Sequence, residues 1–344
     1  MLSINQTSQT GRAAVGPLKL ESGIVLEDIT LQYEMAGPSH APVILVCHAL
    51  TGNHQAIGTE EHPGWWSGLI GPEKYIDTEK YRVLTFNVLG GCDGSTGPAS
   101  TNPQTDLPFR TSFPEITVRD MVHAQFQALD YLNITSIDTV IGGSLGGMQA
   151  MEWALLYPET VEKLIILAST PVFSSYGIAF NHIASSAIKN DPSWQGGNYT
   201  DNTVNGLAIA RMVGMITYRS PQLLEERFGH NRSDVTSYLD YQGEKLINRF
   251  DPNSYLYLLQ AMNGHDIGRN RDGWQNAANK LTQPALLLSF DKDLIYEPDK
   301  VHLFSRALPN SIYRHIETDF GHDGFLTEFP KWGGIVHDFL KEAD

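Results

Sequence analysis

The stretch at residues 139–150 constrains the fold of this chain more than any other, and it reads TVIGGSLGGMQA. An apolar strand end runs into Gly-x-Ser-x-Gly, and a stretch of helical length follows directly, from Leu145 to about Leu156. Gly142 and Gly146 allow backbone segments to approach where a β-carbon would clash. The pattern predicts a sharp strand-to-helix turn that exposes the Ser144 hydroxyl as a nucleophile at a helix N-terminus, where backbone N–H groups favour negative charge. The alternative is an ordinary Gly/Ser-rich turn.

Apolar runs predict the core strands of a central sheet. Most are continuous, as expected of strands buried on both faces, and they lie at residues 42–47, 81–87, 139–141, 163–168, 285–290 and 312–316. Residues 18–20 and 29–33 alternate apolar and polar side chains, which predicts an antiparallel pair at one edge of the sheet. The preceding residues, 1–16, are expected to form a loose arm.

Helical patterns separate these strands. Residues 117–132 begin with a capping-box pattern and carry apolar side chains at helical spacing, and a final amphipathic helix is predicted at about 330–340. The alternation of strand and helix indicates an α/β fold with a mostly parallel sheet flanked by helices.

The pattern changes between residues 171 and 280, where no run is typical of a core strand and helical periodicity is fair only at 206–217 and 254–262. We interpret 171–280 as a helical lid insertion over the C-terminal edge of the sheet, where open α/β sheets bind ligands. Residues 1–170 and 281–344 then form the catalytic domain.

The charge balance excludes some classes of partner. The chain has 24 Lys and Arg against 39 Asp and Glu, a formal net charge of −15, which disfavours nucleic acid and anionic membranes. No apolar run could span a bilayer and the polar N-terminus lacks the apolar core of a signal peptide, so we expect a cytoplasmic protein. The two cysteines, Cys47 and Cys92, are too few for a disulfide framework, and no Cys or His spacing suggests a metal site.

A serine nucleophile needs a base, and the base needs an orienting carboxylate. Asp293 and His322 follow the last two core strands, in the order serine, acid, histidine that the α/β-hydrolase fold uses. Because the C-terminal ends of parallel strands meet at one edge of a sheet, these side chains can converge on Ser144. Asp291 is the alternative acid. Cys92 is a competing nucleophile, although no sharp turn of the same kind surrounds it.

The loop after strand 42–47, His48-Ala49-Leu50-Thr51-Gly52, is the second part of the predicted site. In α/β-hydrolases the oxyanion hole takes one N–H from this loop and one from the residue after the nucleophile. Our candidates are therefore the backbone N–H groups of Leu50 and Leu145, and we interpret the side chains of His48 and Thr51 as ordinary polar groups of a loop. The glycine cluster at 90–98 lacks the ending of a phosphate loop, and we interpret it as a rigid loop beside the site.

Beyond these motifs, stretches spread over nearly the whole chain resemble the homoserine O-acyltransferases of methionine biosynthesis, a family within the α/β-hydrolases. They lie at residues 47–52, 87–92, 142–149, 210–212, 217–220, 238–243 and 321–323. The departures are conservative. One is Leu145, where many relatives carry Met or Phe, and only its backbone N–H should matter.

The resemblance implies a ping-pong reaction, in which acetyl-CoA acylates Ser144, CoA leaves, and the hydroxyl of L-homoserine takes up the acetyl group. Acetyl-CoA is then a co-substrate, and no resident cofactor is expected. The resemblance also implies that Arg211 and Tyr218 bind the carboxylate of homoserine, that Asp323 binds its amine, and that the protein is a homodimer with the lid helices at the interface. A succinyl-CoA donor, a serine acceptor, a plain esterase and a non-catalytic relative are the alternatives.

Overall fold

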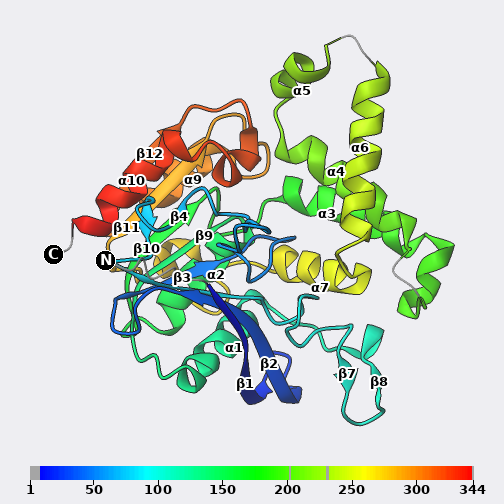
Figure 1. The fold of residues 1–344 in the computed structure, drawn as a ribbon, viewed down its shortest axis with the longest axis horizontal. Helices are drawn as coiled ribbons and strands as arrows, with labels where there is room; N and C mark the ends of the chain where they lie inside the picture. Colours follow the sequence, from blue (N-terminus) through cyan, green and yellow to red (C-terminus); the bar gives the residue numbers. More distant parts are fainter. Residues whose placement is uncertain (1–7, 201–202, 230–231, 343–344) are drawn as a thin grey trace.

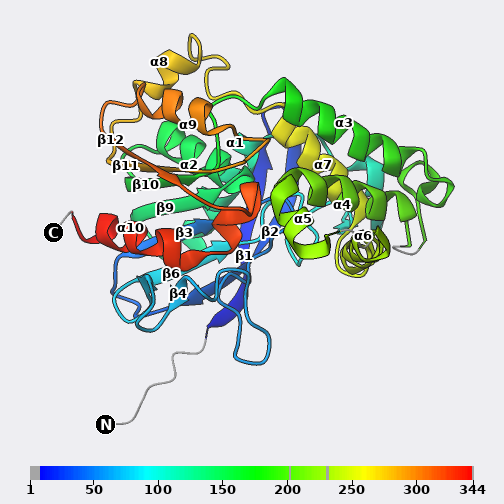
Figure 2. The same ribbon diagram turned by 90° about the horizontal axis from the view of Figure 1, so that it is seen from above.

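A twisted eight-stranded sheet forms the centre of the molecule (Figures 1 and 2), in a computed structural model that describes residues 8–200, 203–229 and 232–342. The strand order is β1-β2-β6-β3-β9-β10-β11-β12. The bounds of these strands are β1 (Gln9–Lys19), β2 (Val25–Ala36), β3 (Val43–Cys47), β6 (Arg82–Phe86), β9 (Ile137–Gly143), β10 (Val161–Leu167), β11 (Ala285–Phe290) and β12 (Ser311–Ile316). From β6 to β12 all neighbours pair in parallel, and β2 pairs antiparallel with both β1 and β6. The predicted α/β class and the mostly parallel sheet are confirmed.

Helices cover both faces of this sheet. The body of the molecule contains α1 (Val118–Tyr131), α2 (Leu145–Leu156), α9 (Pro298–Ser305), α10 (Phe329–Lys341) and the short helices η1 (Arg110–Ser112) and η3 (Gly321–Leu326). Side chains of β3 alternate between two cores, because successive residues of a strand point to opposite faces. Leu45 packs in the core that contains α1, α2 and α9, whereas Ile44 and Val46 pack in the core that contains α10. Two small strand pairs, β4 (Ile70–Gly71) with β5 (Ile76–Asp77) and β7 (Thr101–Asn102) with β8 (Leu107–Pro108), lie in the connections.

The predicted capping box at the start of α1 is confirmed. The Thr117 hydroxyl accepts from the N–H of Asp120, and the Asp120 carboxylate accepts from the N–H of Thr117 at 2.9 Å. This reciprocal pair satisfies donors that the first turn of a helix leaves free.

The expectation of a loose arm at 1–16 is wrong for the part that the structure describes. β1 begins at Gln9 and pairs with β2 from Gln9↔Met35 onward. Small and polar side chains dominate this part of β1, and the strand is held by backbone hydrogen bonds that no apolar periodicity reveals. Residues 1–7 of the predicted arm lie outside the described residues.

Between β10 and β11 the described chain is helical and adds no strand to the main sheet. The elements are α3 (Ser175–Lys189), η2 (Pro192–Gly197), α4 (Asn205–Tyr218), α5 (Pro221–Phe228), α6 (Arg232–Ile247), α7 (Pro252–Asn263) and α8 (Trp274–Ala278). The sequence predicted only the helices that became α4 and α7. Figure 2 shows α3 to α7 gathered on one side of the sheet, beyond the carboxyl ends of the central strands. The limits of the insertion, 171–280, stay a prediction.

A buried ion cluster anchors the end of this helical segment to the body. Glu152 on α2 pairs with Arg119 of α1 at 3.0 Å and with Arg271 at 2.8 Å, and Arg119 also donates to the carbonyl of Arg269. Removing one partner of a buried pair leaves an uncompensated charge and costs about 3–5 kcal/mol. Among the described residues, no helix is both long and apolar enough to cross a membrane.

Candidate active site

Ser144 lies at the sharp turn between β9 and α2, with a left-handed φ of 56° and ψ of −122°. A non-glycine residue held in such a conformation costs about 1–3 kcal/mol, which the surrounding packing must supply. A β-carbon at Gly146 would lie 2.1 Å from the carbonyl oxygen of Cys47, and one at Gly142 would lie 2.3 Å from the backbone of Gly146. Only glycine at both positions therefore lets α2 begin against the ends of β3 and β9.

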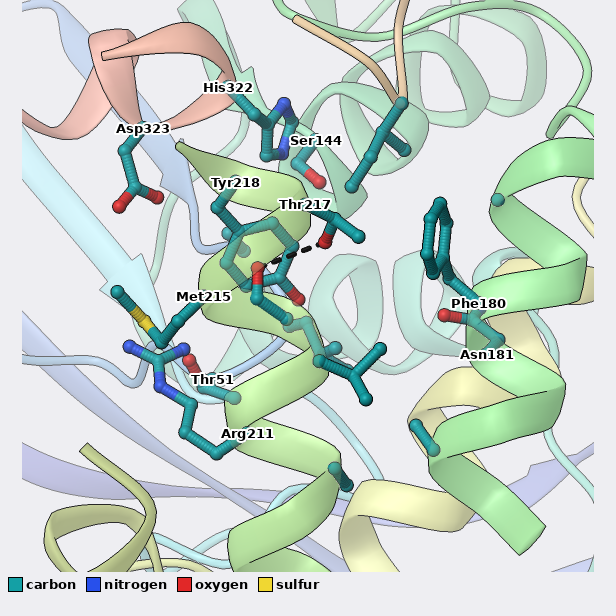
Figure 3. A pocket seen from close by; sticks show the side chains of 18 of the residues that line it. Thr51, Ser144, Phe180, Asn181, Arg211, Met215, Thr217, Tyr218, His322 and Asp323 are labelled. Atoms are coloured by element: carbon teal, nitrogen blue, oxygen red, sulfur yellow. Dashed lines mark hydrogen bonds between the residues drawn. The ribbon is translucent and has the colours of Figure 1, made fainter. Parts of the chain in front are cut away.

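A cavity of about 140 Å³ opens next to Ser144. Body and insertion both line it, and Figure 3 shows Ser144, His322 and Asp323 on one side with the lid helices facing them. From the body it includes Leu50, Thr51, Ser144, His322, Asp323 and Phe325; from the insertion it includes Phe180, Asn181, Arg211, Met215, Thr217, Tyr218 and Arg219. The structure thus brings most of the predicted site residues to one space.

The predicted acid and base are hydrogen-bonded to each other. Nδ1 of His322 lies 2.7 Å from Oδ2 of Asp293, and both side chains are buried. The other carboxylate oxygen, Oδ1, accepts from the N–H groups of Ile295 and Tyr296, each at 2.9 Å. Asp291 is different, because its side chain is 43% exposed and its Oδ1 lies 3.9 Å from Nε2 of His315. The structure therefore pairs His322 with Asp293 rather than with Asp291.

Aromatic rings hold the imidazole of His322 in one orientation. The ring centroids of Tyr218, Tyr296 and Phe325 lie 5.6, 5.2 and 5.2 Å from that of His322. Since Nδ1 is engaged with Asp293, Nε2 is left for proton transfer, and Figure 3 shows the ring beside the Ser144 side chain. A base in this position can take the proton of the serine hydroxyl.

The two backbone donors predicted for an oxyanion hole belong to Leu145, directly after Ser144, and to Leu50, in the loop after β3. Leu145 is the first residue of α2, where an N–H has no acceptor within the helix. Leu50 lines the cavity, and its N–H donates no hydrogen bond within the described part of the chain. Both groups are available to an oxygen that gains negative charge.

The His48 side chain stabilises the loop that carries Leu50. Nε2 accepts from the N–H of Val88 at 3.1 Å, which leaves Nδ1 to donate to the carbonyl of Ala49 at 2.8 Å. Burial lowers the pKa of His48 to about 4, so the ring stays neutral. Gln149 of α2 also donates to the carbonyl of His48, at 3.2 Å. His48 does not line the cavity, in agreement with its interpretation as a polar group of the loop.

Charged groups lie on both sides of the cavity. Arg211, on α4, forms no ion pair with any described residue, and its guanidinium lies 5.9 Å from the ring of Tyr218. Burial raises the pKa of Tyr218, whose hydroxyl interacts with that of Tyr255, so Tyr218 stays protonated. An unpaired guanidinium next to a neutral hydroxyl suits a carboxylate ligand.

Asp323 already has a partner. Its Oδ2 lies 3.2 Å from Nε of Arg219, and both side chains are largely buried. No role could be assigned to Arg219 from the sequence, because its pairing with a residue 104 positions away is a tertiary contact. Only its position in the stretch 217–220, which resembles the family, pointed to Arg219. Thr51 was interpreted as an ordinary loop residue, yet it lines the cavity, as Arg211 does.

The structure argues against Cys92 as a nucleophile. Its sulfur accepts from the N–H of Asp251 at 3.5 Å, and burial raises the thiol pKa to about 12. A thiolate is the reactive form, and it is disfavoured here. The glycine loop 90–98 does not line the cavity; it packs on β2 instead, with the Thr96 N–H donating to the carbonyl of Thr30.

We predict that Asp293→Asn lowers the turnover of an activated ester such as p-nitrophenyl acetate by about 10³- to 10⁴-fold, because an amide cannot hold the imidazole in the required tautomer. The matched variant, Asp291→Asn, should stay within about twofold of the parent, since Asp291 is exposed and does not contact His322. Steady-state kinetics of the two variants provide the measurement. The reverse ranking would assign the acid to Asp291.

Comparisons with known proteins agree with this geometry. The alpha/beta hydrolase fold family matches residues 42–329. The chain is 43% identical to the homoserine O-acetyltransferase of Symbiobacterium thermophilum, over 95% of this chain and 93% of that protein. The solved homoserine O-acetyltransferase of Staphylococcus aureus is 37% identical, with a TM-score of 0.84 and coverage of 98% and 97% of the two chains. That of Bacillus anthracis gives a TM-score of 0.91 at 26% identity and covers 98% of both chains. This chain belongs to the homoserine O-acetyltransferase family of the α/β-hydrolase fold.

Proposed function

We propose that this protein transfers an acetyl group from acetyl-CoA to the hydroxyl of L-homoserine. The observation that carries the proposal is one cavity that joins Ser144, next to the buried His322–Asp293 pair, to the unpaired guanidinium of Arg211. The first group is suited to acyl transfer and the second to an amino-acid carboxylate. Acetyl-CoA acts as a co-substrate, and no resident cofactor is involved.

In the first half-reaction, Oγ of Ser144 attacks the thioester carbonyl of acetyl-CoA while Nε2 of His322 takes the hydroxyl proton. The tetrahedral oxyanion lies against the N–H groups of Leu50 and Leu145. Loss of one such donor costs about 3 kcal/mol in enzymes of this type. His322 then gives its proton to the CoA sulfur, the carbon–sulfur bond breaks, and acetyl-Ser144 remains.

In the second half-reaction the hydroxyl of homoserine attacks the same carbonyl. His322 takes its proton and returns it to Oγ as the ester bond to Ser144 breaks. Asp293 stabilises the imidazolium in both halves, since one of its oxygens bonds Nδ1 and the other is held by two backbone N–H groups.

The cavity offers complementary charges to a zwitterionic amino acid. Arg211 and the Tyr218 hydroxyl bind the carboxylate, and Asp323 binds the ammonium group. Arg219 holds Asp323 in place through the 3.2 Å ion pair, so that amine and guanidinium share one carboxylate. Thr51 lines the same cavity and adds a hydroxyl to the acceptor site.

Transfer is favoured over ester hydrolysis because the nucleophile is shielded from bulk water. The Ser144 residue is only 5% exposed, and helices α3 and α4 supply one wall of the cavity. A closed site allows an amino-acid hydroxyl that is bound through its charges to outcompete water for the acyl group. We also propose a cytoplasmic location, since acyl-CoA donors are intracellular and both cysteines are unpaired thiols.

The test of the function is to incubate the protein with acetyl-CoA and to measure CoA release with and without L-homoserine. We expect continuous release only with homoserine, and one acetyl group on the parent protein but none on Ser144→Ala by mass spectrometry. Equally fast release without homoserine would make the protein an esterase. Parallel assays with succinyl-CoA and with L-serine identify the preferred donor and acceptor.

We predict that Arg211→Ala raises the KM for homoserine by about tenfold to 100-fold, because charge-assisted hydrogen bonds to a carboxylate contribute about 1.5–3 kcal/mol. Acylation of Ser144 by acetyl-CoA should change much less. The control is Arg227→Ala, which removes an exposed guanidinium on α5 that does not line the cavity. Unchanged homoserine kinetics in Arg211→Ala would remove this residue from the acceptor site.

We further propose a homodimer that buries the outer faces of the lid helices. Apolar side chains at seven-residue spacing are half exposed there, which places each pair on one helix face. They are Tyr176 and Ile183 on α3 and Ile209 and Ile216 on α4, with Tyr241 on α6. These helices pack together, and Figure 1 shows them apart from the body of the molecule. An apolar surface of this kind is typical of a protein interface.

If this surface is the interface, Ile183→Glu should convert the dimer into a monomer, because it places a charge in an apolar contact. Light scattering after size-exclusion chromatography gives the mass. Leu303→Glu, an equally exposed apolar residue on α9, is the matched control and should remain dimeric. A parent protein that elutes as a monomer at micromolar concentration would contradict the proposal.

A further inference from the structure

Tyr296 contacts both His322 and Asp293, although the proposed mechanism gives it no role. Its N–H donates to Oδ1 of Asp293 at 2.9 Å. Its ring stacks on the imidazole of His322, with 5.2 Å between centroids and 23° between planes. The ring of Phe173 also packs against it, with 5.9 Å between centroids. Tyr296 is therefore fixed by both its backbone and its ring.

The hydroxyl of Tyr296 is the unusual part. The residue is 1% exposed, and its buried oxygen forms no well-formed hydrogen bond with any described residue. The Ser144 side chain is close enough to interact with that hydroxyl, and burial raises the pKa of Tyr296, so the phenol keeps its proton. A buried donor with a poorly formed hydrogen bond costs stability, and that cost is explained if another state of the site supplies a better acceptor.

We propose that the Tyr296 hydroxyl is a catalytic hydrogen-bond donor to Oγ of Ser144, and that this bond tightens when Oγ gains negative charge during the reaction. A hydrogen bond that is poorly formed in the resting protein and well formed in the transition state lowers the barrier by the difference between the two. The inference rests on the proposed role of Ser144 as nucleophile.

The Tyr296 hydroxyl keeps its proton throughout the proposed reaction. During acetyl transfer to an acceptor, a bond forms between the acceptor oxygen and the acetyl carbon, and the bond between that carbon and Oγ breaks. The proton of the acceptor passes to Nε2 of His322 and then to Oγ. Tyr296 retains its own proton and only shares it with the departing oxygen. Leu50 and Leu145 bind the carbonyl oxygen instead, so the donors act on different atoms.

The experiment compares Tyr296→Phe with the parent in a stopped-flow burst of p-nitrophenol from p-nitrophenyl acetate, which reports acylation of Ser144 without any acceptor. Phe keeps the ring stack and the backbone N–H. We expect the burst rate at saturation to fall at least tenfold, with the half-saturating ester concentration within twofold. The unfolding midpoint should not fall, since the change removes a buried hydroxyl that forms no well-formed hydrogen bond.

The matched control is Tyr238→Phe, which removes the other tyrosine hydroxyl that is buried without a well-formed hydrogen bond to any described residue and does not line the cavity. It should leave the burst rate within twofold and should have the same effect on the unfolding midpoint. A Tyr296→Phe burst rate within twofold of the parent, or a loss of rate together with a lowered midpoint, would overturn the proposal. Failure of the parent to acetylate homoserine would instead refute the proposed acceptor and leave the burst comparison valid.

Discussion

The close contact between the start of α2 and the ends of β3 and β9 is the constraint on which the site depends. It requires glycine at Gly142 and Gly146, and it holds Ser144 in a left-handed conformation. The same contact places the N–H of Leu145 at the edge where the loop after β3 presents Leu50. Because the strands are parallel, β11 and β12 end at that edge too, and the segments that follow them carry Asp293 and His322. One packing requirement in the core thus determines where the chemistry occurs.

The body and the insertion supply different parts of the site. The body holds the reacting groups rigidly, through the backbone bonds to Asp293, the aromatic rings around His322 and the neutral His48 beneath the loop. The insertion brings Arg211 and Tyr218 on α4 and supplies one wall of the cavity. Fold members with the same body can therefore change substrate by changing the insertion, whereas the body tolerates little change.

The sequence predicts the body far better than the insertion. Core strands are continuous apolar runs, and the turn at Ser144 has a motif with a physical cause, so both could be located closely. The edge strand β1 could not, because backbone pairing leaves no apolar pattern in its first half. Helices α3 and α6 keep apolar side chains exposed, which obscures their periodicity. Position along the chain suggested Asp293 and His322, but only coordinates could reveal the pairing of Arg219 with Asp323 or the contacts of Tyr296.

The clamped imidazole has a consequence for the order of events. Rings of Tyr218, Tyr296 and Phe325 prevent the His322 ring from turning, so one nitrogen must serve the leaving thiol and the incoming hydroxyl alike. In the proposed ping-pong reaction both the thioester and the acceptor hydroxyl must reach Ser144 through this one cavity. We therefore expect homoserine that enters first to exclude the thioester, so that abundant acceptor slows its own acetylation. Such substrate inhibition would follow from the architecture rather than from a separate regulatory site.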